Sequence, residues 1–176
     1  FILVILILDF FIWLQHLLTH KIEFLWRIHR VHHSDTEMDI STAIRFHPIE
    51  IALSMGLKIG LVYALGADPL SVLIFEIALN GSSIFNHANI NIPNRIDKIM
   101  RILIVTPDMH RIHHSSNRVE HDTNFGFALS VWDHIFQTYK SRPERDHKEM
   151  EIGLNWQDTK PDELGWSLGL PFKKNG

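Results

Sequence analysis

Two copies of one histidine motif constrain the fold of this chain more than any other feature. Each copy has the pattern His-x-x-His-His, and a third histidine pair lies upstream at a spacing of four residues. A neutral imidazole offers one lone pair to a metal ion, and histidines three or four residues apart share one side of a helix. The pattern therefore predicts a polyhistidine metal site for more than one ion. The motif residues, which include most of the 13 histidines, are His16 and His20, then His29, His32 and His33, then His110, His113 and His114.

The spacing of these histidines limits the path of the chain. On an ideal helix His16 and His20 differ by about 40° in direction and share a face. On the same straight helix His29 would lie about 220° round and about 20 Å beyond His16, too far for a common centre. We therefore expect a turn between Lys21 and Ile28, although that interval contains no Gly or Pro. Within each pentad the two adjacent histidines diverge by about 100°, so they can serve two different ions.

Three apolar stretches predict membrane helices. Residues 1–18 are almost continuously apolar, close to the roughly 18–20 residues of a membrane helix. Residues 51–65 and 70–85 flank a Gly-Ala-Asp-Pro break, which predicts a helical hairpin that spans the bilayer with tilt or dips into it. A buried hairpin in a soluble helical protein is the alternative. Because the chain starts at Phe1 inside an apolar run, we expect a fragment, whose upstream residues could include further membrane segments.

Basic residues after the first apolar stretch indicate its orientation. Lys21, Arg27 and Arg30 follow it closely, and by the positive-inside tendency this end, with the histidine motifs, should be cytoplasmic. The expected fold is all-α: an integral-membrane helical protein with a cytoplasmic cap of shorter helices that carry the histidines. Residues 1–139 would form the membrane-embedded domain, and residues 140–176 a polar, mostly irregular C-terminal tail with short helical pieces.

Composition narrows the class of site and partner. The chain has no cysteine, which excludes disulfides, thiolate metal sites and iron–sulfur clusters. Ligation by nitrogen alone suits Zn, Fe, Cu or Ni. The net charge of −3 provides no basic footprint for nucleic acid. Nucleic acid is therefore not an expected partner.

Two further histidines are candidate ligands. His87 closes the hairpin and returns to the membrane edge at which the motifs are expected. His47 precedes Pro48 and Glu50, a pattern equally typical of a helix start. The histidines without motif spacing, expected at the surface or behind the ligands, are His121, His134 and His147.

Carboxylates and amides near the motifs are candidates for orienting the ligands. A ligand imidazole usually donates its other N–H to such a group, which fixes its tautomer. Asp and Asn also favour turns and caps, so either role is open for each residue. The candidates are Asp35, Asn86, Asn89, Asp108, Asp122, Asn124 and Asp133.

The number of histidines indicates two ions with positions left for small ligands. Tetrahedral zinc takes four ligands, so eight or more imidazoles exceed the needs of one ion. A histidine-bound di-iron pair at a membrane surface suits the activation of O2 beside a lipid chain and the removal of hydrogen from an unactivated C–H bond. Since the chain has no flavin or haem motif, its electrons would come from a separate carrier.

The ordered motifs resemble the fatty acid hydroxylase/sterol desaturase superfamily over residues 9–139. Besides the pentads, the matching segments are Arg-Phe-His-Pro-x-Glu at 45–50, Asn-His-x-Asn at 86–89, Asn-Phe-Gly at 124–126 and Trp-Asp-x-x-Phe at 132–136. Gln137 stands where the family usually has Gly. The resemblance implies a membrane-bound, non-haem di-iron oxidoreductase that uses O2 to hydroxylate or desaturate a sterol, fatty acid or related lipid. It also implies an active site on the cytoplasmic face and an external cytochrome b5- or ferredoxin-type electron donor. Carried over residue by residue, the implied iron ligands are His16, His20, His29, His32, His33, His87, His110, His113 and His114, with His47 as a further candidate.

Two other classes stay open. A membrane zinc-dependent hydrolase or metal-binding module would need a carboxylate near the metal as general base. No Glu or Asp lies inside a histidine motif, although Glu50 or Asp108 could approach in space. A non-catalytic relative that keeps the fold is the third reading, and the intact motifs argue against it.

Overall fold

A computed structural model of the chain describes residues 1–156 and 160–173, and every regular element within them is a helix. Two isolated β-bridges join Ile104 to Leu129 and Ser115 to Ile152. The predicted all-α fold is confirmed. In chain order the elements are α1 (Ile2–Lys21), α2 (Glu23–His29), η1 (His32–Ser34), η2 (Ile40–Ile44), α3 (Pro48–Leu65), α4 (Pro69–His87), α5 (Asn94–Met100), α6 (Pro107–His113), α7 (Arg118–His121), α8 (Val131–Ile135), α9 (Leu164–Gly169) and η3 (Leu170–Phe172).

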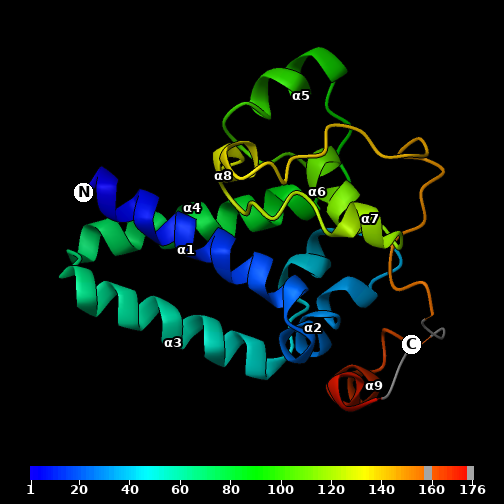
Figure 1. Ribbon diagram of the computed structural model, residues 1–176, viewed down its shortest axis with the longest axis horizontal. Helices are drawn as coiled ribbons and strands as arrows, with labels where there is room; N and C mark the ends of the chain where they lie inside the picture. Colours follow the sequence, from blue (N-terminus) through cyan, green and yellow to red (C-terminus); the bar gives the residue numbers. More distant parts are fainter. Residues whose placement is uncertain (157–159, 174–176) are drawn as a thin grey trace.

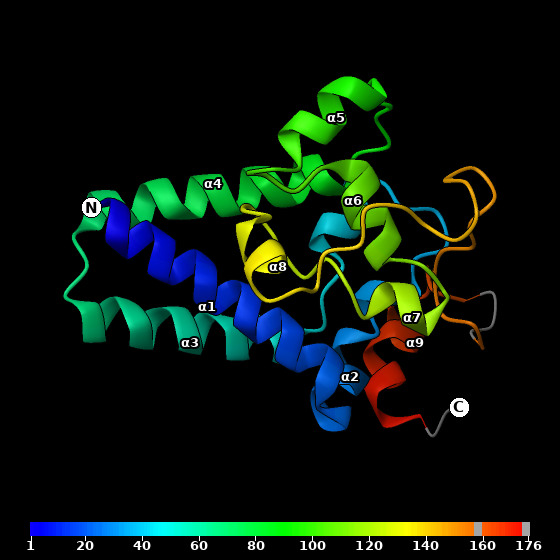
Figure 2. The ribbon, with the colours of Figure 1, turned by 45° about the horizontal axis from the view of Figure 1, so that its top comes forward.

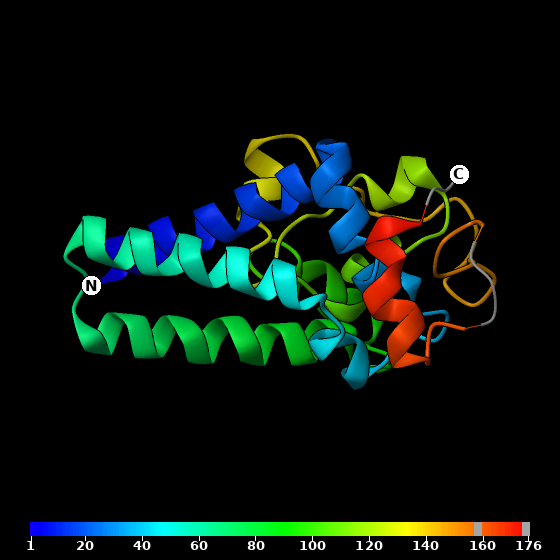
Figure 3. The ribbon, with the colours of Figure 1, turned by 90° about the horizontal axis from the view of Figure 1, so that it is seen from below.

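Three long helices, α1, α3 and α4, occupy one end of the molecule, and α6, α7 and α9 gather at the other (Figure 1). Seen from below, α3 and α4 form an antiparallel hairpin whose connecting loop lies beside the N-terminus (Figure 3). Helix α1 contacts both α3 and α4, and its Leu8 and Ile12 pack with Phe75 of α4 in a buried cluster. The predicted hairpin is confirmed.

Local sequence explains where the hairpin helices begin and end. His47 caps α3, because its ring Nδ1 accepts a hydrogen bond from the Ile49 backbone N–H at 3.2 Å, and Pro occupies the first turn. Helix α3 ends at Gly66, whose φ of 58° lies in the left-handed region that Gly adopts without strain. The Asp68 carboxylate then caps α4 by accepting from the Ser71 N–H.

The long helices present apolar side chains outward. All three are long and apolar enough to cross a membrane by length and composition. Among the residues of α3, only Glu50 is buried, while Ile59 and Tyr63 are 61% and 89% exposed. Such a surface would be a liability in water and suits contact with lipid.

A break after α1 turns the chain back, as the histidine spacing requires. Helix α1 ends at Lys21, Ile22 adopts an extended conformation (φ −103°, ψ 113°), and α2 begins at Glu23. The predicted turn between Lys21 and Ile28 is confirmed. It occurs without Gly or Pro.

The C-terminal segment is mostly irregular apart from α9 and η3, yet it packs against the rest of the chain beside α2 (Figure 2). Val31 forms a buried core with Leu154, Trp166 and Leu170. The Arg30 guanidinium donates to the Leu170 carbonyl at 2.6 Å and to the Lys173 carbonyl at 2.8 Å. This docking was not predicted.

Candidate metal centre

Four segments deliver the histidines to one place. Helix α1 supplies His16 and His20 from one face, and α4 supplies His87 as its last residue. The first pentad spans the end of α2 and η1, and the second lies on α6 and its C-terminal cap. Each of these nine side chains is at most 4% exposed.

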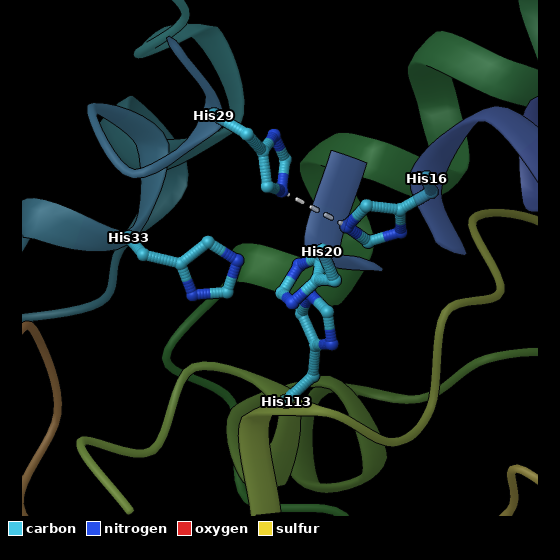
Figure 4. A group of neighbouring side chains, drawn as sticks. All are labelled: His16, His20, His29, His33 and His113. Atoms are coloured by element: carbon cyan, nitrogen blue, oxygen red, sulfur yellow. Dashed lines mark hydrogen bonds between the residues drawn. The ribbon is translucent and has the colours of Figure 1, made fainter. Parts of the chain in front are cut away.

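The nine rings form two groups, and within each group one ring nitrogen per histidine lies within 4.8 Å of all the others. In Figure 4 the rings of the first group point toward a common centre from α1, α2, η1 and α6. We call the first the five-histidine group: His16, His20, His29, His33 and His113. We call the second the four-histidine group: His32, His87, His110 and His114. The groups adjoin, since the rings of His33 and His114 stack with centroids 4.5 Å apart.

Each pentad is shared between the groups. In the first pentad, His29 and His33 belong to the five-histidine group and His32 to the other. In the second pentad the assignment is reversed, because its first and last histidines belong to the four-histidine group and His113 crosses over. Adjacent histidines thus always enter different groups, as their predicted divergence of about 100° requires.

Burial favours the neutral form of His33 and His110. Burial, followed by the nearby His114 and His113 rings, lowers the pKa of His33 well below its usual range. Burial also lowers the pKa of His110, followed by the effects of His87 and His113. A neutral ring retains a lone pair, which is the form that binds a metal.

One contact in the five-histidine group fits a bound metal ion. The Nδ1 of His16 donates to the Phe125 carbonyl at 2.7 Å, and the Nδ1 of His29 donates to Glu50 Oε1 at 2.6 Å. In neutral rings, both Nε2 atoms therefore carry lone pairs. These two Nε2 atoms are 3.2 Å apart. Two lone pairs at that distance repel each other unless a positive ion lies between them.

The four-histidine group shows the same convergence. The Nδ1 of His87 donates to the Ser83 carbonyl at 2.7 Å, which leaves its Nε2 as an acceptor. The Nε2 atoms of His32 and His110 lie 3.2 and 3.1 Å from it. Two imidazoles on one ion, at metal–nitrogen distances of about 2.0–2.1 Å, have nitrogens about 2.8–3.4 Å apart.

The remaining ring nitrogens also fit a metal. A buried polar atom without a partner costs free energy, and native proteins contain few of them. Among the described residues, nine ring nitrogens of six motif histidines are buried without a hydrogen-bond partner: His20 Nδ1 and Nε2, His32 Nδ1, His33 Nδ1 and Nε2, His110 Nδ1, His113 Nε2, and His114 Nδ1 and Nε2. The donor set, all nitrogen and no sulfur, suits iron or zinc.

Asp133 supports the five-histidine group indirectly, through the backbone around Phe125. It accepts hydrogen bonds from the Trp13 indole, the Phe125 and Gly126 backbone N–H groups and the Thr138 hydroxyl, at 2.6–3.1 Å. A Cβ on Gly126 would lie 2.7 Å from the Leu129 carbonyl, so only Gly permits this close approach. The network holds the Phe125 carbonyl that orients His16.

Other predicted orienting residues have different roles. Asp122 lies 3.6 Å from His20 Nδ1. Among the described residues, no other predicted candidate makes a direct polar contact with a motif ring. Asn124 holds the backbone, since its Nδ2 donates to the Met109 and Lys140 carbonyls at 3.0 Å. Asp35 accepts from Thr42 at 2.7 Å, and Asp108 pairs with Arg111 at 3.1 Å.

Sequence reasoning missed Glu50 as the partner of His29. The first-turn Glu of a helix that begins with Pro was read as part of a helix start, which it also is. The available signal was the Arg-Phe-His-Pro-x-Glu motif itself. The partners of His16, His87 and His113 are backbone carbonyls (the last of Thr123, at 2.7 Å), which no residue pattern reveals.

The remaining histidines lie outside the two groups. His47 caps α3. His121 stacks on Trp26 at 5.0 Å and forms a small third group with His20 and Asp122. Burial lowers the pKa of His121 to about 4. His134 donates to the Arg101 carbonyl at 3.0 Å. His147 lines a separate cavity of 720 Å³, and no residue of either histidine group lines that cavity.

A cavity of 340 Å³ lies between α1, α3 and α4 and reaches the metal centre. Its lining includes His16 of the five-histidine group and Glu50, the partner of His29. Ile12, Leu79 and Phe127 supply apolar walls. Most small-molecule sites have this character, mainly apolar with a few placed polar groups.

The sequence of this chain is similar to that of a known family and of several known proteins. The fatty acid hydroxylase family model matches residues 1–138. The chain is 30% identical over 175 residues to ornithine lipid hydroxylase OlsE of Rhizobium tropici, which covers 98% of this chain and 50% of that protein. It is 26% identical over 138 residues to alkylglycerol monooxygenase of Homo sapiens (78% of this chain, 30% of that protein) and 27% identical over 147 residues to cholesterol 25-hydroxylase of Homo sapiens (80% and 50%). The chain thus spans no more than half the length of these relatives. No solved structure gives a significant match.

Proposed function

This chain belongs to the fatty acid hydroxylase family, and on that premise we propose that it is a membrane-bound, non-haem di-iron oxidoreductase that uses O2 to hydroxylate a lipid. The named relatives act on an ornithine lipid, an alkylglycerol and cholesterol. Hydroxylation is accordingly favoured over desaturation. The predicted ligand set, apart from His47, coincides with the two histidine groups.

The observation that carries the proposal is the pair of adjoining, buried histidine groups. One ion in each group accounts for the facing lone pairs of His16 and His29 and for the convergence of three Nε2 atoms around His87. Such a pair of iron ions, when bound, supplies with O2 the oxidising power needed to break an unactivated C–H bond.

The residues around the ions hold and shield them. Glu50, Phe125 and Thr123 fix three rings of the five-histidine group in the tautomer whose Nε2 binds metal. Phe46 stacks on His32 at 4.3 Å and covers it with an apolar face. Burial of all nine ligands excludes bulk water, which protects a reactive centre from side reactions.

The cavity between α1, α3 and α4 is the proposed path of the substrate chain. It opens among the membrane helices and ends at His16, so an alkyl chain can approach the metals directly from the bilayer. The carbon presented beside His16 is the one that would be hydroxylated.

The proposal also includes the orientation of the chain in the membrane and the source of the electrons. Lys21, Arg27 and Arg30 follow α1, and by the positive-inside tendency they support a cytoplasmic location for the histidine end. A cytochrome b5- or ferredoxin-type carrier is the expected donor, because no motif for a flavin or haem is present to supply electrons internally.

One observation favours a second candidate, a membrane zinc hydrolase. Glu50 lines the cavity next to His29, and its Oε2 is buried without a partner among the described residues. A carboxylate in that position can serve as a general base toward a metal-bound water. Asp108 does not fill this role, because it pairs with Arg111 outside both groups.

Metal content and oxygen dependence distinguish the two candidates. Cells that express the wild-type chain should accumulate a hydroxylated lipid under air and not under nitrogen, and the purified protein should hold about two Fe per chain. A His114→Ala variant, matched in expression, controls for background lipid oxidation. Lipid turnover that is equal under nitrogen and supported by zinc alone would establish the hydrolase instead.

A further inference from the structure

The cavity that reaches the metal centre is lined by polar side chains well inside two apolar helices. Its α3 face carries Ser54 and Lys58, and its α4 face carries Glu76, Asn80 and Ser83. Both helices are long and apolar enough to cross a membrane. Ionisable residues in membrane helices are costly and usually mark function.

Three of these residues form one connected cluster at the end of the cavity away from the histidines. Lys58 Nζ donates to Glu76 Oε1 at 2.7 Å, and Asn80 Nδ2 lies 3.3 Å from Glu76 Oε2. Lys58 follows Glu50 by eight residues, which corresponds to about 12 Å along α3. Asn80 precedes His87 by seven residues, or about 10 Å along α4. We call Lys58, Glu76 and Asn80 the polar cluster.

The polar cluster has hydrogen-bonding capacity to spare. An ammonium group has three N–H donors, and one of them serves Glu76. The Asn80 side-chain carbonyl is an acceptor without a partner among the described residues. Nearer the histidines, Gln15 also lines the cavity, and its buried Oε1 has no partner among the described residues.

A structural role alone explains the polar cluster poorly. Replacing a buried ion pair by packed apolar side chains is often neutral or stabilising, and α3 and α4 offer many apolar neighbours. The pair also does not seal the cavity, because the Glu76 side chain keeps 35% of its surface exposed. Its charges cancel, so the site favours an uncharged polar group over an ionic one.

We propose that the polar cluster binds an uncharged hydrogen-bonding group of the lipid substrate, a hydroxyl, ester or amide, while the attached chain runs toward His16. The inference rests on the proposed function and deepens it. The polar cluster lies about 10–12 Å along α3 and α4 from the histidines. The inferred substrate is therefore a lipid whose oxidised carbon lies about that distance from its polar group. A hydrocarbon without that group would lack a fixed orientation in the cavity.

Photoaffinity labelling of the purified full chain tests this orientation. Two dodecyl probes carry a diazirine at one end and either a hydroxyl or a methyl group at the other, and the labelled residues are mapped by peptide mass spectrometry. The hydroxyl probe should label the histidine end, at Ile51 and Phe127, about tenfold more than the polar end, the ratio expected of one hydrogen bond to a charged group. The methyl probe should label both ends about equally.

Two variants connect the result to the polar cluster. Lys58→Met combined with Glu76→Met should abolish the tenfold bias of the hydroxyl probe. Lys58→Glu combined with Glu76→Lys restores an ion pair and should retain the bias, which keeps the test decisive if the first variant does not fold. The matched control is Lys160→Met with Glu163→Met, an exposed pair outside the cavity, which should change nothing.

Three outcomes would overturn the inference: equal labelling patterns for the two probes in the wild-type chain, an undiminished bias in the Met variant, or loss of the bias in the exchanged pair. Iron content is measured on the same preparations. A chain that holds two Fe but shows no bias refutes only the polar-cluster inference, whereas failure to hold iron refutes the proposed function whatever the labelling.

Discussion

The two histidine groups adjoin but are supported differently. In the five-histidine group, three of five rings donate to fixed acceptors: the Phe125 carbonyl, the Thr123 carbonyl and the Glu50 carboxylate. In the four-histidine group, only the His87 ring does so among the described residues, toward Ser83. The five-histidine group also borders the cavity through His16.

The two groups therefore differ in what fixes their rings: hydrogen-bond acceptors in the first, and the position of the backbone in the second. Acceptors behind the five-histidine group fix tautomers before any ion arrives, so this site is preorganised. The four-histidine group depends on the backbone of α4, η1 and α6 to bring its rings together. We therefore expect the first group to depend on its supporting residues and the second to depend on the number of its ligands.

Removing one ligand from each group should give the largest effect and the sharpest contrast. His32→Ala leaves three rings in the four-histidine group, fewer than the four of a tetrahedral ion, so metal content should fall from about two ions per chain to about one. His113→Ala leaves four rings and should keep both ions with weakened binding. Both variants should lose lipid turnover, because the proposed chemistry needs the pair. Equal metal loss in the two variants, measured by elemental analysis, would remove the distinction.

Removing the Asp133 carboxylate should destabilise the scaffold of the five-histidine group. Asp133→Ala leaves three buried donors and the half-buried Thr138 hydroxyl without their acceptor, and it releases the carbonyl that orients His16. The free energy of unfolding should fall by about 3 kcal/mol or more. This corresponds to a fall of about 6–12 °C in the thermal unfolding midpoint. Metal loss should begin in the five-histidine group. An unchanged midpoint would contradict the role given to this network.

Neutralising Glu50 should weaken one group only. Glu50→Gln removes the charge that fixes the His29 tautomer, and metal affinity of the five-histidine group should fall about 10–100-fold. Competition with a chelator would resolve this as one weakened ion and one unchanged ion. Asp108→Asn is the control, because Asp108 pairs with Arg111 away from both groups. Weakening of both ions to the same extent would show that Glu50 does not act through His29.

The smallest expected effect concerns the turn beside Asp133. Gln137 has a φ of 59°, a conformation that favours Gly, and Thr138 next to it donates to Asp133. Gln137→Gly should stabilise the fold by about 1 kcal/mol and leave metal affinity unchanged. Asn124 has a similar φ of 55°, yet Asn124→Gly should destabilise, because its amide bonds two carbonyls. The same sign for both variants in thermal unfolding would refute this account.

Sequence periodicity was sufficient for the parts of the structure that depend on local geometry. The hairpin broken at Gly66, the turn after Lys21 and the division of adjacent histidines between two groups all follow from helix geometry and turn chemistry. Gln137, identified from the sequence as a departure from the resembled family's usual Gly, has a positive φ of 59°.

Features that depend on tertiary contact were not predictable in this way. Backbone carbonyls of Phe125 and Thr123 orient the rings of His16 and His113, and a residue with any side chain at those positions could do the same. Glu50 reaches His29 only because α3 folds back beside α2. The docking of Trp166 and Leu170 onto Val31 likewise arises from packing between segments far apart in the chain.

Anomalous diffraction at the iron edge, on crystals of iron-loaded protein, tests the central claim most directly. The account predicts two iron peaks per chain, one among His16, His20, His29, His33 and His113 and the other among His32, His87, His110 and His114. A single peak, or iron bound only at His121 and Asp122, would contradict it.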